Sequence, residues 1–425
     1  MLAEGPAFGA ERLRKGVLRL FFASLCLSVA IQQTALALLL SLMAWVSVIE
    51  RRPPATPLNR PLGLFLGALL LSTLLSPDVW ASLGAYRKLW LVGAFFATYR
   101  LVEGPREAWR LVLLAVGVAA VVSAYGVVQH FTGIDWAREL LGKEPRLDPF
   151  WFGADEGFRT KGLHPSGITY AHNLLFPLAF ASALMLEPAL GARARLGLLA
   201  AWIPMVFALL FSLTRGVWVA YLAVLVLLAI LKGLRATLSM AACALVLGAF
   251  LMSAGPGVQE RGMSIFSLSD NLGRGQIWRA NVAMIRERPL RGWGFGNFKR
   301  FRDPYYQSYP GADTMAHAHN NFLQVWVDGG LGALAAFLYL FAVILKKGVL
   351  AYRRSIDPRS RALALGGVLA VFGFLVGGLT QYNFGDAEVV VVLWAVAGVL
   401  LRVSESPPTQ DTDSTLAGPA APPVC

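Results

Sequence analysis

Residues 216–232 read GVWVAYLAVLVLLAILK, and this stretch decides the fold class. Its single charged residue stands at its end, and about 20 such residues, or somewhat fewer with flanking charges that reach the interface, cross a bilayer as a helix. Twelve stretches approach this pattern: 17–30, 31–48, 61–76, 89–102, 110–128, 166–187, 196–213, 216–232, 236–253, 321–345, 362–380 and 387–402. We therefore predict an all-α, polytopic helical membrane protein with about 12 transmembrane helices.

The composition supports the same class of protein. Of 425 residues, 56% are hydrophobic and only 15% are charged, and the mean hydropathy is +0.57. These values exclude a soluble enzyme of this length and an intrinsically disordered chain. The three cysteines, Cys26, Cys243 and Cys425, are odd in number and indicate neither a disulfide framework nor a cysteine metal site.

Basic residues beside apolar spans set the topology of a membrane protein, and we attribute the formal charge of +13 first to this role. We do not expect a nucleic acid as a partner. Basic residues gather in alternate short loops, so both termini are predicted to be cytoplasmic. We expect a cytoplasmic N-terminus at 1–16, a transmembrane domain at 17–403 and a disordered cytoplasmic tail at 404–425. Two long loops, about 129–165 and 254–320, then lie on the periplasmic face of the inner membrane, the second with short helices.

The first apolar segment permits more than one interpretation. Residues 17–48 are nearly continuous, and Gln32-Gln33 is the only break, so one span or two are possible. A cleaved signal peptide is the alternative, because Arg12, Arg14 and Lys15 precede the apolar run.

The loop at 254–320 holds nine basic and five acidic residues, a net charge of about +4. An external loop with this charge is expected to meet an anion, either a substrate or lipid headgroups. Trp278, Val282 and Ile285 recur at helical spacing, which predicts a short amphipathic helix on the membrane surface. Residues 291–298, RGWGFGNF, predict a tight glycine turn whose aromatic side chains enter the interface.

The segment HAHNN at 317–321 stands where the next span begins. A histidine at the boundary of water and lipid can take a proton from a lipid-borne substrate, so His319 is a candidate base. It could instead cap the helix, or bind a metal with His317 and Asp313. Asp328 and three glycines follow inside the span, where they must face protein or water.

Arg215 interrupts two apolar runs at the predicted external boundary. The enrichment of Lys and Arg in cytoplasmic loops does not explain a lone arginine at an external boundary. Its side chain either reaches to the interface between spans or binds a phosphate held at the bilayer surface.

These features form an ordered series that resembles the O-antigen ligase and O-antigen polymerase superfamily from about residue 155 to 400. The motifs that carry the resemblance are Arg159 with Gly162, His164 and Pro165; Arg215 with Gly216 and Trp218; Gly273-Arg274 before Trp278; residues 289–298; His319-Asn320; Asp328 to Gly332; and residues 383–386.

The resemblance implies transfer of a glycan from an undecaprenyl pyrophosphate carrier to an acceptor hydroxyl, in lipopolysaccharide biosynthesis, without metal or other cofactor. By the family's motifs His319 is the catalytic residue, and Arg215 and Arg274 bind the pyrophosphate. Many ligases of the family have a small polar residue at the position of Ala333, so whether this chain is a ligase stays open. The second-rank candidates for donor or acceptor contacts are Arg159, Arg279, Arg291, His317, Asn320 and Asp328.

Elementary chemistry agrees with this mechanism. A pyrophosphate leaving group develops charge that two guanidinium groups can stabilise, and His319 can deprotonate the attacking hydroxyl in a single inverting displacement. The partners are then a lipid-linked donor, a lipid or glycan acceptor and the bilayer. We favour a ligase over a polymerase or a protein O-oligosaccharyltransferase. A glycolipid transporter or flippase, which would use the arginines only for binding, is the alternative of another class.

Overall fold

The computed structural model describes residues 6–50, 55–146, 149–152, 155–233, 268–309 and 317–405, with a few positions between 235 and 246. Its first half contains α1 (Pro6–Ser24), α2 (Val29–Glu50), α3 (Asn59–Leu74), α4 (Val79–Ala85), the 3-10 helix η1 (Tyr86–Val92), α5 (Gly93–Leu101), α6 (Pro105–Thr132), α7 (Trp136–Glu139), β1 (Pro149–Phe152), β2 (Asp155–Phe158), α8 (Gly167–Met185), α9 (Ala192–Phe211) and α10 (Arg215–Lys232). The second half contains α13 (Leu268–Glu287), α14 (Phe298–Phe301), α15 (Asp303–Tyr306), α16 (Asn321–Arg354), α17 (Pro358–Gly377), η2 (Asn383–Gly385) and α18 (Ala387–Ser404).

The predicted class of all-α polytopic membrane protein is confirmed. Among the described residues eight helices are long and apolar enough to cross a membrane, namely α2, α6, α8, α9, α10, α16, α17 and α18. Of three further expected spans, 61–76 corresponds to the shorter apolar helix α3 and 89–102 to α5 with the end of η1. The third, 17–30, overlaps only the second half of α1, which ends at Ser24. The expected span at 236–253 lies almost entirely outside the described residues, as does the tail from 406.

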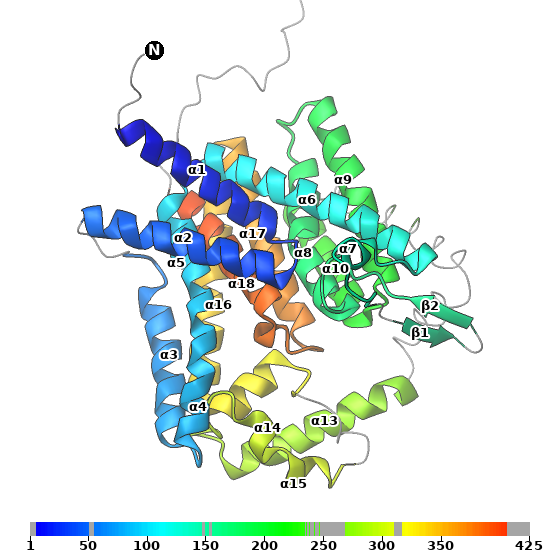
Figure 1. The fold of residues 1–425 in the computed structure, drawn as a ribbon. Helices are drawn as coiled ribbons and strands as arrows, with labels where there is room; N and C mark the ends of the chain where they lie inside the picture. The colour runs from blue at the N-terminus through cyan, green and yellow to red at the C-terminus, as the bar shows by residue number, and fades with distance from the viewer. Residues whose placement is uncertain are drawn as a thin grey trace, which may run out of the picture.

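Helices α8, α17 and α18 form the centre of the bundle (Figure 1). Nearly every residue of α8 is buried, and α17 packs along it. A helix that is apolar on all sides suits such a position, since it has protein neighbours in every direction. α17 and α18 are joined by residues 378–386, called here the α17–α18 loop.

The first two helices are separated earlier than the sequence indicates. α1 ends at Ser24 and α2 begins at Val29, so Gln32 lies inside α2 and not in a break. Its buried side chain donates to the carbonyl oxygens of Leu25 at 3.3 Å and Glu388 at 3.0 Å. These hydrogen bonds satisfy the amide nitrogen, which would otherwise be costly in the core, so the glutamine pair need not interrupt the helix.

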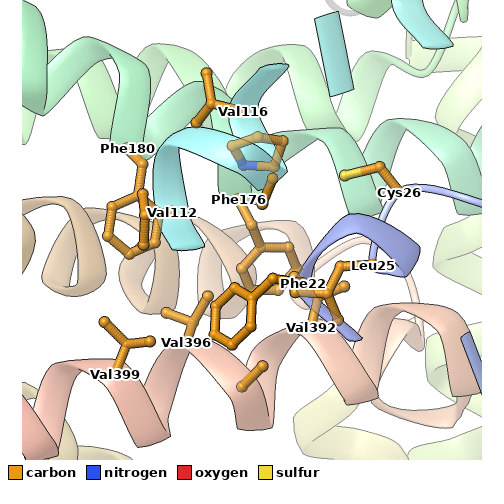
Figure 2. A pocket seen from close by; sticks show the side chains of 13 residues that line it. Phe22, Leu25, Cys26, Val112, Val116, Phe176, Phe180, Val392, Val396 and Val399 are labelled. Carbon is orange, nitrogen blue, oxygen red and sulfur yellow. The ribbon is translucent and has the colours of Figure 1, made fainter. Parts of the chain in front are cut away.

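The end of α1 packs into the centre of the bundle. Figure 2 shows Phe22 and Cys26 facing Phe176 of α8 and Val392 of α18 around an apolar cavity of about 30 Å³. A void of this size is close to the volume of a single water molecule, so α1, α6, α8 and α18 are well packed there.

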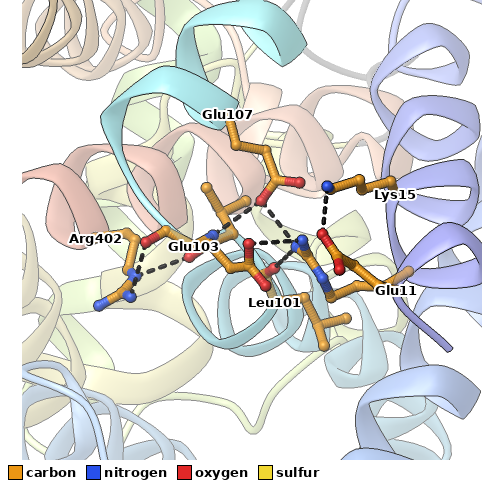
Figure 3. Close-up of polar contacts among 8 residues, drawn as sticks. Glu11, Lys15, Leu101, Glu103, Glu107 and Arg402 are labelled. Carbon is orange, nitrogen blue, oxygen red and sulfur yellow. Dashed lines mark hydrogen bonds and ion pairs between the residues drawn. The ribbon is translucent and has the colours of Figure 1, made fainter. Parts of the chain in front are cut away.

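Arg14, near the middle of α1, joins this helix to the turn between α5 and α6, of which Figure 3 shows Leu101, Glu103 and Glu107. Its guanidinium group lies 2.9 Å from Glu103 and 2.8 Å from Glu107, and donates to Leu101 O at 2.5 Å. Arg402 of α18 donates to carbonyl oxygens of the same turn. These contacts hold the last turn of α18 against the turn between α5 and α6, at the end of α18 that is remote from the α17–α18 loop.

Helices α13, α14 and α15 gather at one end of the molecule, beside the start of α16 (Figure 1). They enclose a second apolar core that includes Ile277, Met284 and Trp293. The expected amphipathic helix therefore exists as α13, but its apolar face differs from the prediction, because Val282 is 37% exposed. The glycine turn also differs. Trp293 is buried in protein, where its indole N–H donates to Met284 O at 3.1 Å, and does not enter the membrane interface.

The segment expected as one span at 321–345 is broken near its beginning. α16 has non-helical backbone angles at Gly330, with φ 72° and ψ −176°, so a short first helix precedes the long one. A Cβ at Gly330 would lie 2.1 Å from Leu290 O, because the glycine turn packs directly on this break. Asp328 is consequently buried in protein at the end of the short helix.

The first long loop contains a small antiparallel hairpin of β1 and β2, which the sequence did not predict. Beyond it, Lys161 and Asp135 form a buried ion pair at 2.8 Å. The pair fastens this loop to the segment after α6.

Candidate functional site

Arg215 is the first residue of α10 and follows a strained turn. The turn holds Leu213 at φ 54°, a left-handed conformation that large side chains rarely adopt. Ser212 and Trp218 fix the turn, because both side chains donate to Leu209 O, at 2.6 and 2.9 Å. Strain of this kind persists only where the surroundings hold it, and it concentrates at functional sites.

His319 also has a positive φ, 48°; no other non-glycine residue in the described part of the chain shares this feature except Leu213. The following residue, Asn320, caps the first turn of α16 and donates its side-chain amide to Leu379 O at 2.9 Å. The N–H of Asn321 donates to Gly378 O at 2.7 Å. His319 is thereby held against the α17–α18 loop.

The imidazole of His319 contacts Gln381 of that loop, with Nδ1 2.6 Å from Oε1. An amide oxygen only accepts, so Nδ1 carries the proton and Nε2 has the lone pair of a base. Burial is the largest cause that lowers the pKa of His319, the hydrogen bond to Gln381 opposes it, and the charge of Arg274 lowers it further. The ring is therefore neutral at pH 7, as a general base must be.

Arg274, half-buried on α13, lies near both His319 and Arg215. Its pKa is lowered first by burial and then by the positive charge of Arg215. Arg274 is thus within electrostatic range of both other residues that the sequence ranked first, although the three come from separate elements. Two neighbouring guanidinium groups raise the free energy of the unliganded protein, and a bound anion would relieve their repulsion.

Two second-rank candidates lie beside this group. The imidazole of His317 has its centroid 4.2 Å from that of His319. Arg159 precedes Thr160, whose N–H donates to Phe211 O at the end of α9, next to the turn before α10. The Nε of Arg159 is buried and has no hydrogen-bond partner among the described residues, so its N–H can donate to a ligand.

The remaining candidates have other positions. Arg279 and Arg291 are exposed, and no described contact joins them to the cluster. The side chain of Asn320 is used in capping α16 and in bonding the α17–α18 loop, which suits a positioning role. Asp328 accepts a hydrogen bond from Gln324 at 3.2 Å, and Gln324 in turn accepts one from the N–H of Ala318, between the two histidines.

Sequence reasoning missed two features of the site. Gln381, the partner of His319, lies 62 residues away along the chain, and no motif or spacing indicates the pair. Its neighbour Thr380 packs on Gly216, where a Cβ would lie 2.1 Å from the hydroxyl oxygen, so the loop also meets the start of α10. Arg87 and Lys88 of η1 line a cavity together with His317. They were not recognised in the sequence either, because they resemble charges that flank a span.

A metal site does not emerge from the described residues, among which no group of three or more His, Cys, Asp or Glu side chains could hold an ion. Asp313, which the metal interpretation needs, lies outside the described residues. The arrangement of two cations and a neutral imidazole instead suits binding of an anionic leaving group and removal of one proton.

Comparison with known proteins points to one family. A family model described as O-antigen ligase matches residues 200–338, which include Arg215, Arg274 and His319. A curated O-antigen ligase of Salmonella typhimurium is 26% identical over 215 residues, which is 46% of this chain and 50% of the relative. The chain thus spans about half the length of the curated relative that it matches. The chain is therefore similar to O-antigen ligases over residues 200–338, the part that contains the three first-ranked candidates.

Proposed function

We propose that this protein is a membrane glycosyltransferase of the O-antigen ligase type. It transfers a glycan from undecaprenyl pyrophosphate to a hydroxyl on an acceptor lipid, with inversion and without a metal. The observation that carries the proposal is the meeting of Arg215, Arg274 and a neutral His319, held from α10, α13 and the start of α16. The likeness to the Salmonella O-antigen ligase supports the same activity.

Each group has one role in the displacement. Arg215 and Arg274 bind the pyrophosphate and stabilise the negative charge that develops as the bond between the anomeric carbon and the phosphate oxygen breaks. The acceptor oxygen forms the new bond to that carbon from the opposite side, and its proton passes to Nε2 of His319. Undecaprenyl pyrophosphate leaves with the bonding electron pair, so atoms and charge balance in one step.

The distribution of charge supports a site on the periplasmic face. Arg353, Arg354, Arg359 and Arg361 surround the turn between α16 and α17, at the opposite end of α17 from the α17–α18 loop. Short loops rich in basic residues remain in the cytoplasm. The α17–α18 loop and His319 then face the periplasm, where a translocated lipid-linked glycan is available, and both termini are cytoplasmic.

The test is a transfer assay with purified protein in nanodiscs. A defined undecaprenyl-pyrophosphate oligosaccharide is supplied with and without an acceptor lipid, and the products are resolved by mass spectrometry. One glycan on the acceptor, with undecaprenyl pyrophosphate released, is the expected result. A ladder from donor alone would indicate a polymerase, and intact donor with every acceptor tried would favour a transporter.

Two variants connect the assay to the site. His319→Ala is expected to abolish transfer in a folded protein, and retained turnover would remove His319 from the mechanism. Arg274→Lys should lose activity, whereas Arg286→Lys, an exposed arginine on the same helix, should not. Equal effects of the two lysine substitutions would mean that the loss is not specific to the anion site.

A further inference from the structure

A cavity of about 580 Å³ opens beside His317. It lies between η1, the glycine turn, the first turns of α16 and the start of α18, and His317 and Asp328 form part of its wall. Cavities of this size enclose small organic ligands, so the end of an oligosaccharide fits. None of the roles described above uses this space.

Its mouth is positively charged. Three lining residues are basic, namely Arg87, Lys88 and Lys299, and all three side chains are exposed, whereas Asp328 is the one acidic residue in the lining and is buried. The two lysines come from η1 and from the segment after the glycine turn, so they approach the space from different elements. Converging cations at the rim of a partly enclosed cavity concentrate anions there.

The walls inside the mouth suit a sugar. Trp90 and Tyr382 offer aromatic surfaces against which the apolar face of a pyranose ring can pack. The amide of Gln324 and the carboxyl group of Asp328 offer hydrogen-bond partners for hydroxyl groups. The site therefore combines recognition of a sugar ring with recognition of a negative charge.

The cavity is distinct from the arginine pair. The cation that acts on His319 is Arg274, whereas Lys299 and Arg302 act on His317. Neither Arg215 nor Arg274 lines the cavity, whereas His317 does, and its ring centroid lies 4.2 Å from that of His319. In an inverting displacement the nucleophile attacks from the side opposite the leaving group, so a pyrophosphate on Arg215 and Arg274 directs the acceptor to the other side.

We infer that this cavity binds the acceptor, and that the acceptor is an anionic glycan with a phosphate or carboxylate near the hydroxyl that is glycosylated. The assignment of the ligand as the acceptor rests on the proposed function. The anionic sugar site itself is inferred from the residues that line the cavity. Lys88 and Lys299 bind the anionic group, and His317 and Asp328 face the sugar.

Binding of small probes tests the site without requiring turnover. Saturation-transfer NMR on the protein in nanodiscs compares glucose 6-phosphate, glucuronate and glucose. The wild type should bind at least one charged sugar more tightly than glucose, and Lys88→Gln and Lys299→Gln should each weaken that binding about tenfold. Lys143→Gln, an exposed lysine outside the cavity, is the matched control. Thermal unfolding verifies that each variant is folded.

The outcomes separate the two proposals. Equal binding of all three sugars, or unchanged binding in both lysine variants, would overturn the cavity inference. If charged sugars bind through the lysines but the wild type transfers no glycan, the proposed function fails and the anionic sugar site remains. Where transfer occurs, the lysine variants should raise KM for a phosphorylated acceptor about tenfold and leave KM for the donor unchanged. A rise in the donor KM alone would assign the cavity to the donor.

Discussion

The contact between Gln381 and His319 permits a prediction whose sign is fixed by the structure. Gln381→Glu keeps the shape of the side chain and places a carboxylate where an amide oxygen now lies 2.6 Å from Nδ1. An opposite charge at this distance stabilises the protonated imidazole, and such pairs raise a histidine pKa by about one to three units. Both side chains are partly accessible to solvent, so we expect a value in the lower half of that range.

The direction of the effect on activity follows from the role of the base. His319 must be neutral to accept a proton, so activity is present above its pKa and falls tenfold for each pH unit below it. Raising the pKa by one to two units lowers kcat/KM about 10- to 100-fold at pH values below both the wild-type and the variant pKa, with recovery at high pH. Gln381→Ala acts oppositely on the acid limb, because the lost hydrogen bond is one that raises the pKa of His319.

The assay is the pH dependence of kcat/KM for transfer between about pH 5 and 9. The wild type should have an acid limb below the ordinary histidine pKa of about 6.5, since burial lowers the pKa of His319. Gln307→Glu, the same chemical change at an exposed position, should reproduce the wild-type profile. Coincident acid limbs for the wild type and Gln381→Glu, or shifts in the same direction for both Gln381 variants, would refute the assignment of His319 as the base held by Gln381.

Arg274→Lys, Gly330→Ala and Glu187→Gln, with Gly332→Ala as a control, test the anion site and the fold. Arg274→Lys keeps the charge but loses the bidentate geometry, and should lower kcat/KM about 100-fold, measured with the donor varied; a change below threefold would contradict its role. Gly330→Ala should destabilise the protein by more than about 2 kcal/mol, because its φ is 72° and a Cβ would meet Leu290 O. Gly332→Ala, with open space at the Cβ, should be neutral in the same thermal unfolding measurement. Glu187→Gln leaves Arg361, now 2.5 Å from the buried carboxylate, without its charge partner, and should cost about 3 kcal/mol in chemical unfolding; an unchanged midpoint would show that the pair adds nothing.

Local pattern was sufficient for some parts of the molecule. Apolar stretches such as 216–232 become membrane helices wherever they occur, because the backbone must satisfy its own hydrogen bonds in lipid. The glycines at 292–296 predict a tight turn, and the positive φ values of Gly292, Gly294 and Gly296 confirm it. Each of these conclusions depends on neighbouring residues alone.

Other features depended on packing between distant segments. The exposure of Val282 and the burial of Trp293 follow from a second core that α13 forms with α15 and the start of α16. Gln32 could remain in a helix because Glu388 supplies a carbonyl oxygen from the far end of the chain. Hydropathy along the chain contains no information about such partners.

The sequence by itself determined that this chain is a polytopic helical membrane protein; Arg215 and His319 are predicted site residues from their positions in the chain, and Arg274 from the family resemblance. Only the tertiary structure decided that Gln381 orients His319, that α16 breaks at Gly330, and that Lys88 and Lys299 meet at one cavity. The physical reason is that composition and periodicity govern whether a segment prefers lipid, whereas a site forms from side chains far apart in the chain whose distances are fixed by how the helices pack.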